Sequence, residues 1–280
     1  MDPPIRAFTF VDRITELQPG SKVRGRYSIP SGIEGFPLSL VGEAVGQLAA
    51  WAAMTATQFE YRPVAGVAGT IELLSPVRPG QVLELAAKLE SVDTEAVAYD
   101  GIASVNGTPV LRLQNCVGPM MPLADFDDPQ GVRECFALLC SGGAAPGGFG
   151  GVPDLPLERT GHESGQWIRG RLQVPASAVL FSDHFPRRHV FPGSLLMEMN
   201  LKLAAAMASE LPTPDERGRW TILKVSDMKL RAFVGPGESL DIEARLTELS
   251  ARSATVAVET RNEKRVVGAV RLLLALVERS

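Results

Sequence analysis

Histidine and cysteine are scarce in this chain of 280 residues, which contains three of each. The cysteines, Cys116, Cys135 and Cys140, are odd in number and lack the paired spacing of a zinc site. Their number and spacing argue against a metal site and a disulfide framework, so we expect reduced thiols and a cytoplasmic protein. The few histidines are important because imidazole is the side chain that ordinarily titrates near neutral pH.

Long apolar runs and long basic runs are also missing. No run approaches the roughly 18 apolar residues that a membrane helix requires. The first twenty residues include Asp12 and Glu16 and have no apolar core, which argues against a signal peptide. The formal net charge is −4, so general nucleic-acid binding is not expected. With 45% hydrophobic and 21% charged residues, the composition is typical of a soluble globular protein.

The second half of the chain repeats landmarks of the first. The landmarks are a strand-like run with Arg-Gly-Arg that ends in proline, a Phe-Pro pair ahead of a glutamate, and a Pro-Gly turn. They stand at 23–30, Phe36 to Glu43 and Pro79-Gly80, and again at 168–175, Phe191 to Glu198 and Pro236-Gly237. A repeat of this length indicates two copies of one fold packed together.

Each copy combines one apolar helix with several strands. Residues 38–57 are rich in Ala, Leu, Val and Met with Glu43 as their one charged residue, which predicts a buried helix after Pro37. Strand-like runs follow at 67–74, 82–89, 96–105 and 110–117, with Asn106-Gly107 as a hairpin signal. The predicted fold class is therefore α+β, in which each half is a long buried helix against an antiparallel sheet.

The composition changes between the two copies. We expect a first unit at 1–124, a linker at 125–164 and a second unit at 165–280. The linker contains a possible short helix that extends to Cys140, followed by a Gly-, Ala- and Pro-rich stretch at 141–151 that we expect to run over the surface.

The two halves differ in one segment that bears on chemistry. Six positions separate Pro30 from Phe36 in the first half, whereas sixteen separate Pro175 from Phe191 in the second. The additional residues bring in His184, and the first unit has no histidine. His162 falls in the predicted linker and is expected at the surface.

These motifs resemble a known family. His184-Phe185-Pro186, Val190-Phe191-Pro192-Gly193 and Glu198 are similar to the active-site segment of the 3-hydroxyacyl-[acyl-carrier-protein] dehydratases of fatty acid synthesis. The stretch from Phe36-Pro37 to Glu43 and Gln47 resembles the helix of the same family. The resemblance implies the hot-dog fold, a long helix wrapped by an antiparallel sheet. The paired layout resembles the double hot-dog dehydratases of polyketide and polyunsaturated fatty acid synthases, in which two halves pack as a pseudo-dimer.

The family's reaction needs a base, an acid and a donor to the thioester oxygen. His184 suits the base. The backbone N–H of Gly193, at a helix start, suits the donor, although the glycine could instead serve a tight turn. In the family the histidine meets the carboxylate of the other subunit, so the resemblance implies Glu43 as the acid rather than Glu198.

The residues after each glutamate agree with this choice. Gln47 lies one helical turn after Glu43, as in the family, whereas Lys202 takes that place after Glu198. We therefore expect Glu198 and Lys202 to form an ion pair at an inactive second site. Supporting or substrate-binding positions are expected at Gln47, Phe185, Phe191 and Pro192.

Three further residues of the segment have open roles. Arg187 and Arg188 are equally suited to the phosphate of a pantetheine arm, to an acidic carrier protein, or to solvent. His189 replaces a proline usual in the family and is expected to be solvent-facing or structural.

The resemblance also implies partners and leaves rival functions. An acyl-carrier-protein or coenzyme A thioester is the expected substrate, with no metal and no redox cofactor, and a homodimer is compatible with the sequence. The rivals are hydration of an enoyl thioester, double-bond isomerisation and thioester hydrolysis on the same fold. A non-catalytic acyl-binding scaffold is the alternative outside enzymes.

Overall fold

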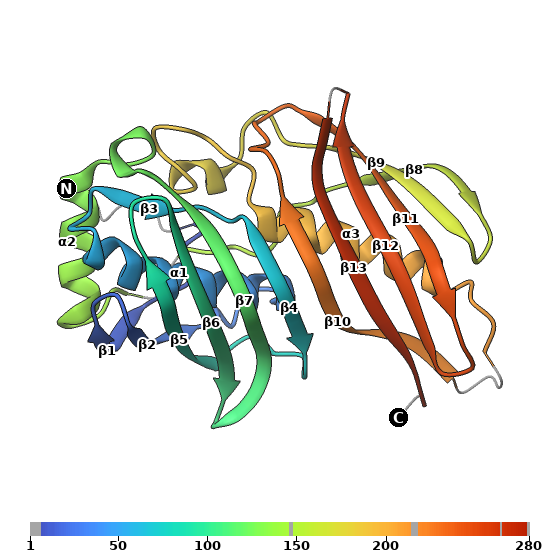
Figure 1. The fold of residues 1–280 in the computed structure, drawn as a ribbon, viewed down its shortest axis with the longest axis horizontal. Helices are drawn as coiled ribbons and strands as arrows, with labels where there is room; N and C mark the ends of the chain where they lie inside the picture. Colours follow the sequence, from blue (N-terminus) through green and yellow to red (C-terminus); the bar gives the residue numbers. More distant parts are fainter. Residues whose placement is uncertain (1–6, 146–147, 214–217, 264, 279–280) are drawn as a thin grey trace.

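The computed structural model describes residues 7–145, 148–213, 218–263 and 265–278 (Figure 1). The ends of the two predicted units, 1–6 and 279–280, lie outside this range. The helices are α1 (Leu38–Ala56), α2 (Pro129–Cys140) and α3 (Gly193–Ala208), with short 3-10 turns η1 (Leu123–Asp125) and η2 (Val179–Ser182). The strands are β1 (Arg13–Gln18), β2 (Lys22–Ser28), β3 (Tyr61–Pro63), β4 (Val67–Leu73), β5 (Val82–Val92), β6 (Ala96–Val105), β7 (Thr108–Pro122), β8 (Leu157–Glu163), β9 (Trp167–Gln173), β10 (Gly218–Leu230), β11 (Ser239–Leu249), β12 (Ser253–Asn262) and β13 (Arg265–Glu278).

One antiparallel sheet passes through both halves of the chain (Figure 1). Its strand order is β1-β2-β5-β6-β7-β4-β10-β13-β12-β11-β9-β8, and β3 pairs with β7 beside this path. The order is symmetric about its centre, where β4 and β10 pair from Val67 opposite Lys229 to Glu72 opposite Lys224. The repeated landmarks of the sequence therefore occupy matching positions on the two sides of the β4–β10 joint.

The two long helices lie on the same side of the sheet and contact each other (Figure 1). Helix α1 packs mainly against β2, β5 and β6, and α3 against β9, β10 and β11. Alternate residues of β5, such as Leu83 and Leu85, are buried toward the helix, as expected for a strand with one covered face. Each such leucine contributes roughly 1.5–3 kcal/mol of hydrophobic stabilisation.

The predicted linker is more ordered than its composition suggests. The expected helix is present as α2, begun by Pro129 and capped by the Asp128 carboxylate, which accepts from Gly131 N–H at 2.9 Å. The stretch at 141–151 was expected over the surface, but this is wrong at Phe149, which is buried. Its ring lies edge-on to Phe10 at 5.2 Å between ring centroids. Phe149, which follows the first half in sequence, therefore packs into the aromatic cluster of that half.

Strand β8 also lies inside the predicted linker, where it pairs with β9 and extends the second half of the sheet. Its sequence, Leu-Glu-Arg-Thr-Gly-His-Glu, carries a single large apolar residue because an edge strand needs little burial. His162, on this strand, is exposed as expected.

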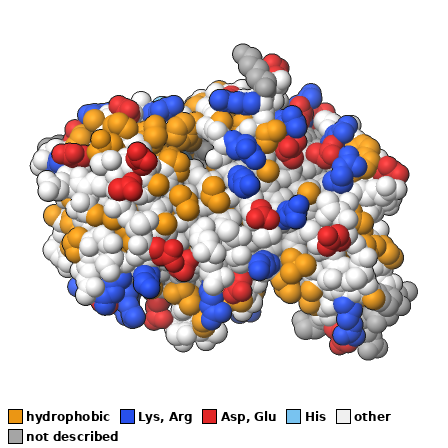
Figure 2. Space-filling model, viewed as in Figure 1, with side chains coloured by type: hydrophobic (Ala, Val, Ile, Leu, Met, Phe, Trp, Pro, Cys, Tyr) orange, Lys and Arg blue, Asp and Glu red, His pale blue; other side chains and the backbone are white. Residues whose placement is uncertain are grey.

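The outer face of the sheet mixes charged and apolar side chains (Figure 2).

In the described part of the chain, no helix is both long enough and apolar enough to cross a membrane.

Candidate active site

A cavity of about 990 Å³ lies between the two halves, and both contribute to its walls. The first half supplies Glu43 and Gln47 from α1, and the second half supplies His184 and Gly193. Helix α2 forms a further part of the wall through residues such as Val132. The size and mainly apolar lining are those of a site that encloses most of a small apolar molecule.

His184 is buried, with 9% of its surface exposed, in the segment that joins η2 to α3. Its Nδ1 lies 2.9 Å from the carbonyl oxygen of Val190. Because a carbonyl only accepts, Nδ1 carries the hydrogen and Nε2 is the basic nitrogen of the neutral ring. Burial lowers the pKa of His184 below 6.5, and Arg62 lowers it further, while Glu43 and the Val190 bond oppose the shift. The ring is therefore held in its neutral, basic form near pH 7.

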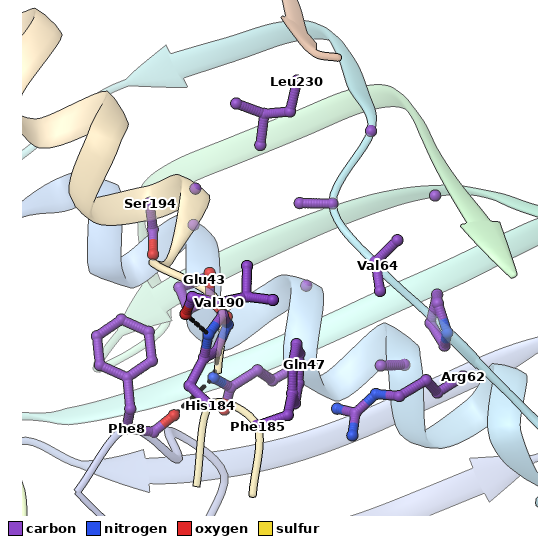
Figure 3. A pocket seen from close by; sticks show the side chains of 18 of the residues that line it. Phe8, Glu43, Gln47, Arg62, Val64, His184, Phe185, Val190, Ser194 and Leu230 are labelled. Atoms are coloured by element: carbon purple, nitrogen blue, oxygen red, sulfur yellow. Dashed lines mark hydrogen bonds between the residues drawn. The ribbon is translucent and has the colours of Figure 1, made fainter. Parts of the chain in front are cut away.

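Glu43 projects from α1 into the same part of the cavity as His184 (Figure 3). Its Oε1 accepts a hydrogen bond from Gln47 Nε2 at 3.0 Å. Gln47 also donates to the carbonyl of Phe8 at 3.0 Å and accepts from the N–H of Phe10 at 2.7 Å. These bonds fix the orientation of the Gln47 amide, and through it one oxygen of the Glu43 carboxylate.

Glu198 has different neighbours. Its Oε2 accepts from the hydroxyl of Ser39 at 2.9 Å, and Lys202 Nζ lies 4.0 Å from its Oε1. It is absent from the described residues that line the cavity. The structure thus brings Glu43, and not Glu198, to His184, while the chemical roles of these residues remain predictions.

Gly193 begins α3 and lines the cavity, with Pro192 at the cap position. A Cβ at Gly193 would lie 2.3 Å from Cδ1 of Leu230, so a side chain at this position would require the end of the Leu230 side chain to move. Gly193 is not among the described glycines with a positive φ, so its conformation does not indicate a tight turn. The Gly193 N–H belongs to the first turn of a helix, where backbone donors have no partner within the helix.

The remaining predicted positions support the segment in different ways. Phe185 and Phe191 line the cavity and are buried. The N–H of Phe191 donates to the carbonyl of Val234 at 2.7 Å. Pro192 accepts from the N–H groups of Leu195 and Leu196 at 3.1 Å each, and so holds the first turn of α3.

Sequence reasoning missed Arg62, which lies on β3 of the first half and lines the cavity. Its guanidinium carbon is 3.9 Å from the centroid of the Phe185 ring. The Phe185 ring in turn stacks on the imidazole of His184, with centroids 4.3 Å apart and planes 24° from parallel. Arg62 forms an ion pair with Asp127, and burial lowers the pKa of the arginine and raises that of the aspartate.

The predicted linker therefore contacts the histidine segment directly. Arg187 donates from its guanidinium to the carbonyl of Ala124 at 3.0 Å and to Asp128 Oδ1 at 3.2 Å. The backbone N–H of Arg187 donates to the carbonyl of Phe126 at 3.0 Å, and the Phe126 ring lies edge-on to Phe185 at 5.3 Å. The acidic run before α2 was visible in the sequence, but nothing in it indicated these partners.

The other histidine of the segment is outside the cavity. His189 is exposed and its ring stacks on Phe181 at 5.7 Å between centroids. Among the described residues, no group of three or more His, Cys, Asp or Glu side chains is placed to hold a metal ion.

Residues 160–269 match the family model of ApeI-like dehydratases, described as ApeI dehydratase. The chain is also similar to the 3-hydroxyacyl-[acyl-carrier-protein] dehydratase FabZ of Rickettsia felis, with 30% identity over 96 residues, 33% of this chain and 66% of the relative. The second half of this chain is therefore similar to the hot-dog dehydratases. FabZ of Vibrio cholerae is 30% identical over 93 residues, 32% of this chain and 61% of the relative. The chain thus spans slightly less than two thirds of the length of these hot-dog dehydratases.

Solved structures extend the fold to the first half. A putative oleoyl thioesterase from Lactobacillus plantarum superposes with a TM-score of 0.61 at 11% identity, covering 93% of this chain and 98% of that one. The tesB protein of Mycobacterium avium subs paratuberculosis gives 0.56 at 10% identity, covering 94% and 96%. At such identities the likeness shows the hot-dog fold alone. The half that matches the family model and the half before it therefore share a hot-dog architecture built on one large antiparallel sheet.

Proposed function

We propose that this chain is a double hot-dog dehydratase, a pseudo-dimer within one chain that removes water from a 3-hydroxyacyl thioester to give a trans-2-enoyl thioester. The observation that carries the proposal is the meeting of His184 and Glu43, from opposite halves, in one cavity. One is a buried imidazole with a basic Nε2, and the other is a carboxylate held by Gln47.

The proposed reaction divides its proton transfers between the two halves. Nε2 of His184 removes the C2 proton of the substrate, and the Glu43 carboxyl gives a proton to the C3 hydroxyl as the C3–O bond breaks. Water leaves, the C2–C3 double bond forms, and a proton passes back from the imidazolium to the Glu43 carboxylate. The Gly193 N–H stabilises the negative charge that develops on the thioester oxygen.

The cavity suits an apolar acyl chain, and the thioester would arrive on an acyl carrier protein or on coenzyme A. Dehydration of this kind needs no metal and no redox cofactor. We place the reaction in fatty acid or polyketide-type synthesis in the cytoplasm, with the units divided as 1–124, 125–164 and 165–280. Association of two such chains into a homodimer is compatible with this scheme.

Mass spectrometry of the protein incubated with a panel of 3-hydroxyacyl carrier-protein thioesters tests the proposal. A product lighter by one water is expected from at least one substrate, and from none with His184→Ala. The same assay distinguishes dehydration from thioester hydrolysis and from a non-catalytic scaffold. Release of free carrier thiol without loss of water would replace dehydration by hydrolysis, and binding without turnover would indicate a scaffold.

A further inference from the structure

Two serines occupy matching positions at the starts of α1 and α3. Ser39 follows Phe36-Pro37-Leu38, and Ser194 follows Phe191-Pro192-Gly193. The hydroxyl of Ser39 donates across the helix interface to Glu198 at 2.9 Å. By the repeat of the fold, the corresponding partner of Ser194 is Glu43.

Ser194 does not form the corresponding hydrogen bond to Glu43. Its Oγ is buried and has no hydrogen-bond partner in the described part of the chain, although the residue lines the cavity. Figure 3 shows its side chain directed toward the region of Glu43 and His184. A buried hydroxyl without a partner is costly, so such a group at a cavity wall is poised for a ligand.

We propose that the Ser194 hydroxyl is a further catalytic residue, which donates a hydrogen bond to the C3 hydroxyl oxygen of the substrate. This inference rests on the proposed dehydration. The C3 oxygen must lie beside Glu43 to receive its proton, and Ser194 faces the same space from α3. A second donor there stabilises the oxygen while the C3–O bond breaks, and the Ser194 proton itself is not transferred.

The repeat supplies a matched control. Ser39→Ala removes a hydroxyl that bonds to the protein, so its unfolding midpoint should fall while kcat per folded molecule is retained. Ser194→Ala removes a hydroxyl that has no protein partner among the described residues, so its midpoint should not fall. Its kcat/KM for a 3-hydroxyacyl thioester should nevertheless drop roughly three- to tenfold, the worth of one hydrogen bond. A Ser194→Ala variant with lower stability and unchanged kcat/KM would overturn the assignment.

Binding provides a second measurement that does not depend on turnover. In a His184→Ala background, the affinities for the 3-hydroxyoctanoyl and octanoyl thioesters of N-acetylcysteamine are compared with and without Ser194→Ala. Ser194→Ala should weaken the binding of the 3-hydroxyoctanoyl thioester roughly three- to tenfold and leave the binding of the octanoyl thioester unchanged. Equal effects on both ligands, or none, would overturn the contact with the C3 hydroxyl. If the wild-type protein forms no enoyl product, the proposed function fails, and the binding comparison still decides whether Ser194 contacts the hydroxyl.

Discussion

The guanidinium carbon of Arg62 lies 3.9 Å from the centre of the Phe185 ring, and that ring stacks on the imidazole of His184. Arg62 comes from the first half, His184 from the second, and Asp127, which pairs with Arg62, from the segment between them. A buried cation over an aromatic face contributes on the order of 1–2 kcal/mol. The first half, through Arg62, and the connecting segment, through Asp127, therefore help to hold His184, the proposed base from the second half.

This stack predicts a change in pH dependence when Arg62 is replaced. The variant Arg62→Gln/Asp127→Asn removes both charges together, so that no buried charge is left without a partner. Because the Arg62 charge lowers the pKa of His184, its loss should raise that pKa. The acid limb of the kcat/KM profile should then move to higher pH and kcat should fall.

Arg169→Gln is the control for this experiment. Arg169 also lies over an aromatic ring, at 4.8 Å from Trp167, but its side chain is 54% exposed and it is not among the described residues that line the cavity. Its profile should match the wild type. An unshifted acid limb in the Arg62 variant would show that the stack does not act on His184.

The wild-type protein should remain active below the ordinary pKa of histidine. Burial lowers the pKa of His184 from 6.5, so kcat/KM of the free enzyme should begin to fall only below that pH. The stability of the folded chain should fall in the same pH range. Below pH 6.5 the unfolded chain binds a proton at His184 that the folded chain does not bind. The free energy of unfolding should decrease as pH falls from 6.5 through the lower folded-state value, and less so in His184→Gln.

Glu43 and Glu198 should respond differently to the same substitution. Glu43→Gln removes the carboxyl proton donor and should lower kcat by roughly 10²–10⁴-fold. Glu198→Gln keeps an acceptor for the Ser39 hydroxyl and loses an ion pair whose lysine is 57% exposed, so its kcat should be nearly unchanged. Steady-state dehydration rates measure both. An inactive Glu198→Gln beside an active Glu43→Gln would reverse the assignment of the acid.

The meeting of His184 with Glu43 could be predicted because sequence differences between the halves mark it. One half has the longer segment with histidine, and the other keeps Gln47 where its counterpart has Lys202. These are local features of a repeated pattern, and the family resemblance supplies the pairing across halves.

The support of the site could not be predicted in the same way. Arg62 lies in a strand of three residues, and Asp127 is 65 positions away in a segment without a known motif. Phe149 is one aromatic residue in a stretch of Gly, Ala and Pro, and its burial depends on a gap beside Phe10 that no local pattern indicates. Contacts of this kind are set by three-dimensional packing, whereas periodicity reports only which face of an element is covered.

The proposed donor role of Gly193 can be separated from its packing role. Gly193→Ala alone would place a Cβ 2.3 Å from Leu230 Cδ1, so both comparisons use a Leu230→Ala background in which that space is open. Gly193→Ala/Leu230→Ala keeps the backbone N–H. Gly193→Pro/Leu230→Ala removes it, at the first helical position where proline is tolerated.

The backbone on either side suits this replacement. Pro192 has φ −59° and ψ 131°, an extended conformation that a residue before proline favours. Helix α3 should therefore form in both variants, which circular dichroism and unfolding midpoints check. If the Gly193 N–H stabilises the thioester oxygen, the alanine variant should retain most of the activity of Leu230→Ala, and the proline variant should lose roughly 10²–10³ in kcat. Equal activities of the two double variants would contradict the donor role, because the backbone N–H at position 193 is the group that distinguishes them.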